Sequence, residues 1–376
     1  MINRVKTMLI VTLLVIFFVT IVCIILPPSL GKTKPFVDEN GNISGESISE
    51  KAFVDVNGAS LGMFIMVKDR TKPVLLFLGG GPGIPEYFME KNYPSGLESE
   101  FVVCYLEYRG TSLSYNRNIT IESMTIDQYI YDVVEITTYL RNRFKQEKIY
   151  LIGHSFGTIV GIKTVYQHPE LYHSYIAMAQ IINANESERL AYNYMYGQYQ
   201  SQNNTRMKKR FEKYPIAISE DAFRKYSMSL LRDTAMHDLG VGTTRDMDSV
   251  IKGIFFPSLR NTVYTPAERI NIWRGKIFAG KTPVGKSHLS FNAFEEIPKI
   301  DIPIYFLAGA YDYTCCYSLQ KAYFEQIQSP LKAFYTFHNS AHSPLFEEPE
   351  KAIKILLEDV TNGRTDNSDI IEKGIH

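Results

Sequence analysis

Cysteine is scarce in this chain, with four residues among 376, at Cys23, Cys104, Cys315 and Cys316. Their spacing matches neither a zinc site nor the disulfide framework of a small secreted domain. The adjacent pair could close only a strained ring, so we expect Cys315 and Cys316 to be packing residues. The sequence therefore predicts no metal site and no cofactor.

Net charge is also absent, because 40 lysines and arginines balance 40 aspartates and glutamates. A neutral chain has no overall field to attract nucleic acid, so we predict no nucleic-acid partner. There is no internal repeat and no low-complexity run. With 45% hydrophobic residues the chain can bury a large core, as two domains or as one domain with a sizeable insertion.

An uncharged apolar stretch of 19 residues runs from Met8 to Leu26 and is preceded by Arg4 and Lys6. As a helix it would be about 28 Å long, close to the roughly 30 Å hydrocarbon core of a bilayer. We predict that residues 1–31 are a single-pass membrane anchor. The basic residues before it place the rest of the chain on the extracytoplasmic side. A cleaved signal peptide and a lipoprotein signal at Cys23 are the alternatives, but the apolar run is long for a signal peptide.

Residues 32–50 are rich in small and polar residues, which predicts a linker between the anchor and the folded part. The apolar runs Ala52–Val56 and Ser60–Val67 follow, on either side of Asn57 and Gly58. An Asn-Gly pair between two such runs is the strongest short-range signal for a β-hairpin.

Short apolar runs then alternate with helical patterns. Ile126–Phe144 carries apolar residues at spacings of three and four, which predicts an amphipathic helix. The predicted buried strands are Val74–Leu78, Phe101–Leu106, Ile149–Ile152, Tyr175–Ala179 and Ile302–Ala308. This alternation predicts an α/β fold, a mostly parallel sheet with helices on both faces.

The alternation stops between residues 181 and 299, which are polar and helical in pattern. An insertion of this length between two strands predicts a helical cap over the carboxyl edge of the sheet, where open α/β folds bind ligands. We therefore expect core segments at 51–180 and 300–362, the cap between them, and a polar tail at 363–376.

The central motif is G-x-S-x-G, at residues Gly153 to Gly157, between a predicted strand and the helical run Thr158–Gln167. A nucleophile on a sharp strand-to-helix turn needs small neighbours two positions before and after it. Ser155 is therefore the predicted nucleophile. The amide of Phe156, at the helix amino terminus, is the predicted first oxyanion donor.

A second glycine-rich turn, Gly79 to Gly83, follows the predicted strand Val74–Leu78. Such a turn can direct an amide towards the nucleophile as the second oxyanion donor. We favour Gly81, with Gly80 as the alternate. A phosphate-binding loop would need a lysine and a serine or threonine after the glycines, which are missing here.

A serine nucleophile needs a base within reach and a carboxylate that holds the base. His342 follows the predicted last strand and is the favoured base, with His338 at the strand end as the rival. Asp312 follows its strand at the carboxyl edge, whereas Asp301 lies at the opposite end. The order along the chain, Ser155 then aspartate then histidine, is the one that this strand-to-helix serine motif requires.

These motifs resemble those of the proline iminopeptidase group of α/β-hydrolases, over residues 51–180 and 301–360. Gly80–Gly83 is similar to the end of that group's H-G-G-P-G, and Tyr108–Ser114 to its Q-R-G-x-G-x-S. Three further matching segments are Gly153–Gly157, Gly309–Asp312 and Ser340–Pro344. The chain departs from the group at four positions. It has Gly79 where the group has histidine, Tyr108 where it has glutamine, Ser112 where it has glycine, and Phe156 where it often has tryptophan. The resemblance implies an α/β-hydrolase fold, and the departures bear on the substrate.

In that family acidic residues of the cap bind the free amino terminus of the substrate, which makes Glu186 and Glu188 the candidates. Asn185 with Glu188 would also fit a helix capping box. Arg109 is expected to brace the glycine loop rather than to clamp a substrate carboxylate. Three tyrosines at helical spacing in the cap, Tyr192, Tyr196 and Tyr199, are expected to pack within it.

The sequence thus predicts a serine hydrolase that transfers an acyl group to water. The expected substrates are short peptides with an apolar or prolyl amino terminus. An esterase acting on small or lipid-derived acyl esters is the alternative enzyme, favoured by the anchor. An inactive, membrane-attached binding protein is the alternative from another class.

Overall fold

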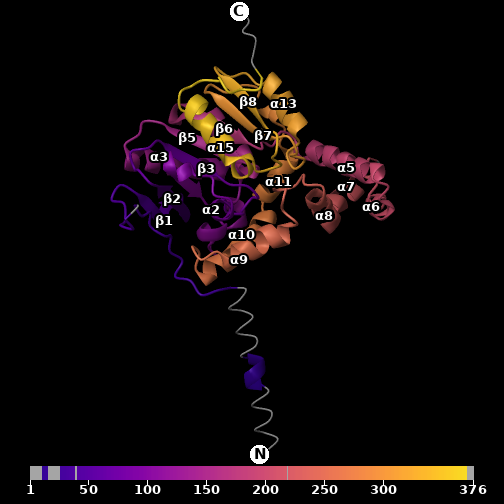
Figure 1. Cartoon of the computed structure of the whole chain (residues 1–376), viewed down its shortest axis with the longest axis horizontal. Helices are drawn as coiled ribbons and strands as arrows, with labels where there is room; N and C mark the ends of the chain where they lie inside the picture. Colours follow the sequence, from indigo (N-terminus) through magenta and orange to yellow (C-terminus); the bar gives the residue numbers. More distant parts are fainter. Residues whose placement is uncertain (1–10, 16–25, 39, 218, 371–376) are drawn as a thin grey trace, which may run out of the picture.

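The computed structural model describes residues 11–15, 26–38, 40–217 and 219–370 (Figure 1). Most of the predicted membrane helix Met8–Leu26 therefore lies outside the described residues. Within the described ranges, no helix has both the length and the apolar character needed to cross a bilayer.

One sheet of eight strands organises the described part of the chain, in the order β1-β2-β4-β3-β5-β6-β7-β8. β1 and β2 form the predicted hairpin, with Val56 opposite Ala59 across the Asn-Gly turn. β2 is antiparallel to β4, and all later pairs are parallel. The strands are β1 Ile48–Val56, β2 Ala59–Val67, β3 Val74–Leu78, β4 Val102–Leu106, β5 Ile149–His154, β6 Tyr172–Met178, β7 Ile304–Gly309 and β8 Lys332–Phe337.

Helices cover both faces of the sheet, so the central strands are buried on both sides and read as continuous apolar runs. Every residue of β3, for example, is buried. The helix α3 begins and ends where the apolar spacing predicts, and the Thr125 side chain caps it by accepting from the Gln128 amide. The core helices are α2 Tyr87–Asn92, α3 Ile126–Phe144, α4 Phe156–Gln167, α13 Tyr317–Gln326, α14 Pro344–Glu347 and α15 Pro349–Ile355. Short helical turns are η1 Leu97–Ser99, η2 Ser112–Ser114, η3 Ile121–Ser123, η4 Pro169–Leu171 and η6 Leu356–Val360.

A helical insertion separates β6 from β7. Its elements are α5 Ala184–Ser201, α6 Thr205–Phe211, α7 Glu220–Ser227, α8 Leu230–Asp238, η5 Ile251–Phe255, α9 Phe256–Arg260, α10 Pro266–Gly280, α11 Pro283–Ser290 and α12 Ala293–Glu296. Figure 1 shows α5 to α8 grouped on one side of the molecule, with α9 and α10 at its lower edge. The first group has its own apolar core, in which Tyr192 and Tyr199 are buried and Tyr196 is partly buried.

Arg109 does not brace the glycine loop, so that prediction is wrong. Its guanidinium makes a two-pronged ion pair with Asp132 of α3, with N–O distances of 2.8 and 2.7 Å. It also donates to the carbonyls of Val56 and Asn57 in the hairpin turn. A planar guanidinium suits a buried carboxylate, so Arg109 fastens the antiparallel hairpin to α3.

Two flanking segments also contact the core. The Thr33 hydroxyl donates to the Ser49 carbonyl of β1. Near the other end, the Asp369 amide donates to the Phe334 carbonyl, and the Ser368 hydroxyl accepts from the Phe334 amide, along β8. Backbone groups at this edge of the sheet are thereby paired.

Candidate active site

Ser155 occupies the sharp turn between β5 and α4. Its backbone angles, φ 52° and ψ −121°, are strained for a residue with a side chain. A Cβ at Gly157 would lie 2.0 Å from the Leu78 carbonyl oxygen, so only glycine fits there. This close approach explains the glycine two residues after Ser155 in the G-x-S-x-G motif.

Asp312 and His342 meet in the loops that follow β7 and β8. Oδ2 of Asp312 lies 3.0 Å from Nδ1 of His342, and Oδ1 accepts the amides of Thr314 and Cys315 at 2.8 Å each. Both side chains are buried. Because a carboxylate only accepts, Nδ1 of His342 carries the proton, and Nε2 is the free acceptor of the neutral ring.

Gly309, at the end of β7, makes the meeting of these two loops possible. A Cβ there would lie 1.8 Å from the Ala341 carbonyl oxygen. The loop that carries His342 therefore packs directly against the backbone of Gly309. The role of this glycine was missed from the sequence. A glycine at the very end of a buried strand is the signal that could have indicated it.

Ser155 and His342 both line a cavity of about 260 Å³. In the part of the chain that the structure describes, no hydrogen bond joins the Ser155 hydroxyl to the imidazole. Such bonds are often long in unliganded sites and tighten when substrate binds. The rival histidine, His338, is exposed and lines neither of the two cavities at Ser155.

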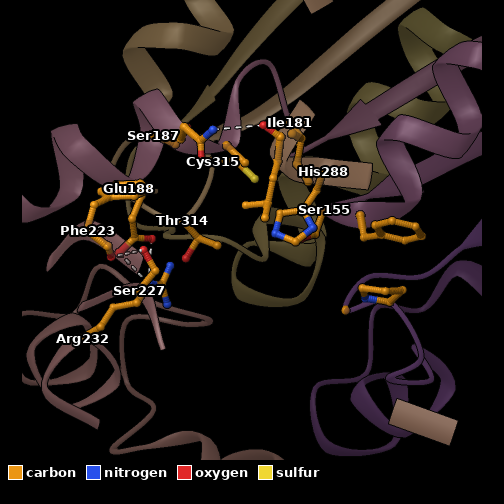
Figure 2. A pocket seen from close by; sticks show the side chains of 16 residues that line it. Ser155, Ile181, Ser187, Glu188, Phe223, Ser227, Arg232, His288, Thr314 and Cys315 are labelled. Atoms are coloured by element: carbon orange, nitrogen blue, oxygen red, sulfur yellow. Dashed lines mark hydrogen bonds and ion pairs between the residues drawn. The ribbon is translucent and has the colours of Figure 1, made fainter. Parts of the chain in front are cut away.

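A second cavity, of about 310 Å³, reaches Ser155 from the side of the insertion. Its wall includes Glu188, Arg232 and Cys315. Figure 2 shows Glu188 and Arg232 across this cavity from Ser155. Four residues line both cavities: Gly81, Ser155, Arg232 and Thr314. Two adjoining cavities therefore meet at Ser155.

Of the two candidate oxyanion donors, Phe156 follows Ser155 directly in the chain and Gly81 lines both cavities with it. Phe156 is the first residue of α4, so its amide has no acceptor within the helix. Gly81 has a φ of +108°, which favours glycine. The Gly80 amide already donates to Oε1 of Glu86 at 3.0 Å, so Gly80 is not a free donor and the alternate assignment is wrong.

Lys276 of α10 was not singled out from the sequence, yet it contacts the glycine loop. Its ammonium group donates to the Gly81 carbonyl. Burial lowers the pKa of Lys276 to about 8. No motif marks this lysine, because 195 residues separate it from its partner.

Of the two acidic residues proposed for amine recognition, only Glu188 faces a cavity. Both its oxygens accept from Nε of Arg232, at 2.8 and 2.7 Å. Glu186 is exposed and lines neither cavity. The predicted capping box is wrong, because the side chain that caps α5 belongs to Asn183, which accepts from the Glu186 amide.

Among the described residues one group of potential metal ligands lies close together, formed by Asp312, Cys315 and His342. The Asp312 oxygens are already taken by two amides and the imidazole. Burial raises the pKa of the Cys315 thiol well above its ordinary value, whereas a metal requires the thiolate. These residues therefore do not fit a metal site. Cys104, Cys315 and Cys316 are free and buried.

Residues 73–349 match the family model for the alpha/beta hydrolase fold, and the chain therefore belongs to the α/β-hydrolase fold family. It is 31% identical over 290 residues to the "Probable aminopeptidase YbaC" of Bacillus subtilis (strain 168), covering 75% of this chain and 86% of that protein. The resemblance to prolyl aminopeptidases is confirmed.

Among the solved structures that share the fold are two whose names refer to proline iminopeptidases. The proline iminopeptidase of Mycobacterium smegmatis has a TM-score of 0.59 at 13% identity, with 83% of this chain and 98% of that chain covered. A proline iminopeptidase-related protein of Thermus thermophilus has a TM-score of 0.54 at 19% identity, covering 82% and 97%.

Proposed function

We propose that the chain is a serine hydrolase. The observation that supports this most is the Asp312 carboxylate holding Nδ1 of His342 in the cavity that Ser155 also lines. In this proposal the Ser155 oxygen attacks a substrate carbonyl while Nε2 of His342 takes its proton. The amides of Phe156 and Gly81 bind the oxyanion. His342 then protonates the leaving group, and water releases the acyl group from the serine by the same steps.

The proposed activity is that of an aminopeptidase on short peptides, with the insertion acting as a cap over the site. The name of the Bacillus subtilis relative supports this proposal. So does the buried carboxylate of Glu188 in the cavity of about 310 Å³, because each of its oxygens still has a lone pair for a substrate ammonium group.

Replacing Glu188 by glutamine tests this assignment. We expect KM for an aminoacyl arylamide with a free amine to rise about 10- to 100-fold, since a charged hydrogen bond contributes about 1.5 to 3 kcal/mol. Steady-state kinetics on the free and the N-acetylated arylamide measure the effect. Glu186→Gln, on the same helix but outside the cavity, is the matched control and should behave as wild type. Equal effects on both substrates would contradict amine recognition by Glu188.

An esterase is the second candidate. The cavity beside His342 supports it, because its wall contains Phe88, Met89, Met236 and Ile254, which suit an apolar acyl chain. A prolyl arylamide and a butyryl ester separate the two activities. Release from the amide only when its amine is free would exclude the simple esterase.

We also propose that the chain is held at a membrane with its folded part on the extracytoplasmic side. This proposal rests on the sequence alone, on the apolar run Met8–Leu26 for the anchor and on Arg4 and Lys6 for its orientation. Extraction of cell membranes with alkaline carbonate tests it. Release of the full chain into the supernatant would contradict it.

A further inference from the structure

A second carboxylate–imidazole pair lies beside the site, formed by Glu86 and His154. Oε1 of Glu86 is 2.6 Å from Nδ1 of His154 and also accepts the Gly80 amide at 3.0 Å. Both side chains are buried, with 7% and 5% of their surface exposed. The proposed mechanism gives this pair no role, and a buried charged group requires a partner.

The contacts of His154 fix how many protons the pair holds. Its Nε2 lies 2.8 Å from the His342 carbonyl oxygen, which can only accept, so Nε2 carries a hydrogen. A further proton lies between Nδ1 and the Glu86 carboxyl group, because two bare lone pairs would repel at 2.6 Å. Burial alone would lower the pKa of His154, but the Glu86 carboxylate and the His342 carbonyl together raise it above its ordinary value.

The pair joins the three segments that carry the proposed reacting groups. Glu86 holds the amide of Gly80, the neighbour of Gly81 in the glycine loop. His154 directly precedes Ser155 on the turn after β5. The ring of His154 also holds the backbone of His342, and the centroids of the two imidazoles are 5.0 Å apart.

We infer that Glu86 and His154 are positioning residues that hold the oxyanion loop, Ser155 and His342 in the geometry that acyl transfer requires. The inference rests on the proposed function and adds residues that act through others. Misplacing a reacting group by about 1 Å can cost on the order of 100-fold in rate. Loss of the pair should therefore lower the rate of the chemical step more than substrate binding.

The variant Glu86→Gln tests the inference. A glutamine cannot serve both partners as the carboxylate does. With its NH₂ group towards Nδ1 it leaves the Gly80 amide unpaired, and with its oxygen there it leaves an imidazolium without a counter-charge. We expect kcat, and the rate at which a fluorophosphonate labels Ser155, to fall about 10- to 100-fold. Both residues line the cavity beside His342, but Oε1 of Glu86 and the two ring nitrogens of His154 bind protein groups rather than a substrate. KM should therefore change less than about threefold.

Glu90→Gln is the matched control. Glu90 lies one turn further along, in α2, is also buried, and binds Ser95 and Tyr105 rather than the proposed catalytic segments. We expect its labelling rate to stay at the wild-type value. A double-mutant cycle with His154→Gln adds a second criterion. When two residues act as one unit, the effects of their substitutions on the rate do not add in free energy. The double variant Glu86→Gln/His154→Gln should be no slower than the worse single variant.

Labelling separates this inference from the proposed function. A wild-type chain that takes no label would contradict the serine hydrolase itself. If the wild type is labelled and Glu86→Gln is labelled at the same rate, only the positioning role is overturned. The same holds if the losses of labelling rate in Glu86→Gln and His154→Gln multiply in the double variant. Should Glu86→Gln fail to fold, Glu86→Asp, which keeps the charge on a shorter stem, should show the same loss of labelling rate. A wild-type rate in that variant would overturn the inference.

Discussion

Replacing Ser155 by alanine is expected to abolish turnover and covalent labelling. In the proposed mechanism the bond to the acyl group forms at this oxygen, so the two-step route disappears without it. Loss of a serine nucleophile lowers kcat by up to about 10⁶-fold. The variant would still be faster than the uncatalysed reaction in water, because the oxyanion donors and substrate binding remain. Hydrolysis of aminoacyl arylamides and labelling by a fluorophosphonate measure the two effects.

The matched control is Ser227→Ala. Ser227 lines the cavity of about 310 Å³ that Ser155 also lines, and its hydroxyl donates to the Phe223 carbonyl within α7. The Ser227→Ala variant should be labelled, and should turn over substrate, as the wild type does. A Ser155→Ala chain that is still labelled would place the nucleophile elsewhere. A folded wild-type chain that takes no label and cleaves none of the amides or esters would support the inactive binding protein instead.

Much of the fold could be predicted, because periodicity is a local property of the sequence. The helix Ile126–Phe144 and the strand Val74–Leu78 have the predicted bounds. The hairpin follows from its Asn-Gly turn. Strand ends elsewhere shifted by one to four residues, and β1 begins at Ile48, inside the predicted linker 32–50. Hydrogen bonding to neighbouring strands decides where strands such as β6 and β7 begin.

The meeting of Asp312 with His342 was predictable for a topological reason. Both residues follow parallel strands, and the carboxyl ends of parallel strands meet at one edge of a sheet. The contacts of Glu86 and Lys276 were not predictable in this way. They join residues 68 and 195 positions apart through side chains, and no periodicity or spacing encodes such a contact.

Two of the local errors have a similar cause. Asn183 and Asn185 are both good capping residues, and the backbone path after β6 decides between them. Arg109 belongs to the segment Tyr108–Ser114 and was expected to contact the glycine loop, but its partner Asp132 lies on α3. Sequence identifies a residue that needs a partner more readily than it identifies the partner.

Replacing Asp312 by asparagine should lower kcat about 10⁴-fold, as a wrong histidine tautomer does in a serine–histidine–aspartate triad. Oδ1 accepts two amides, so the asparagine oxygen should stay there and its NH₂ group should face Nδ1 of His342. An NH₂ group donates, so Nδ1 becomes the acceptor and the proton moves to Nε2. His342 can then no longer accept the Ser155 proton, although the shape of the site is kept.

Asp301→Asn separates this effect from a general loss of acidic charge. Asp301 precedes the same strand, β7, and pairs with Lys299 at the exposed, opposite end. Surface pairs of this kind contribute about 0 to 1 kcal/mol, so kcat should stay at the wild-type value. The melting temperature of Asp312→Asn, followed by circular dichroism, shows whether the fold is kept. A well-folded Asp312→Asn chain with near-normal kcat would mean that the carboxylate does not orient the base, and the proposed roles of both Asp312 and His342 would fall together.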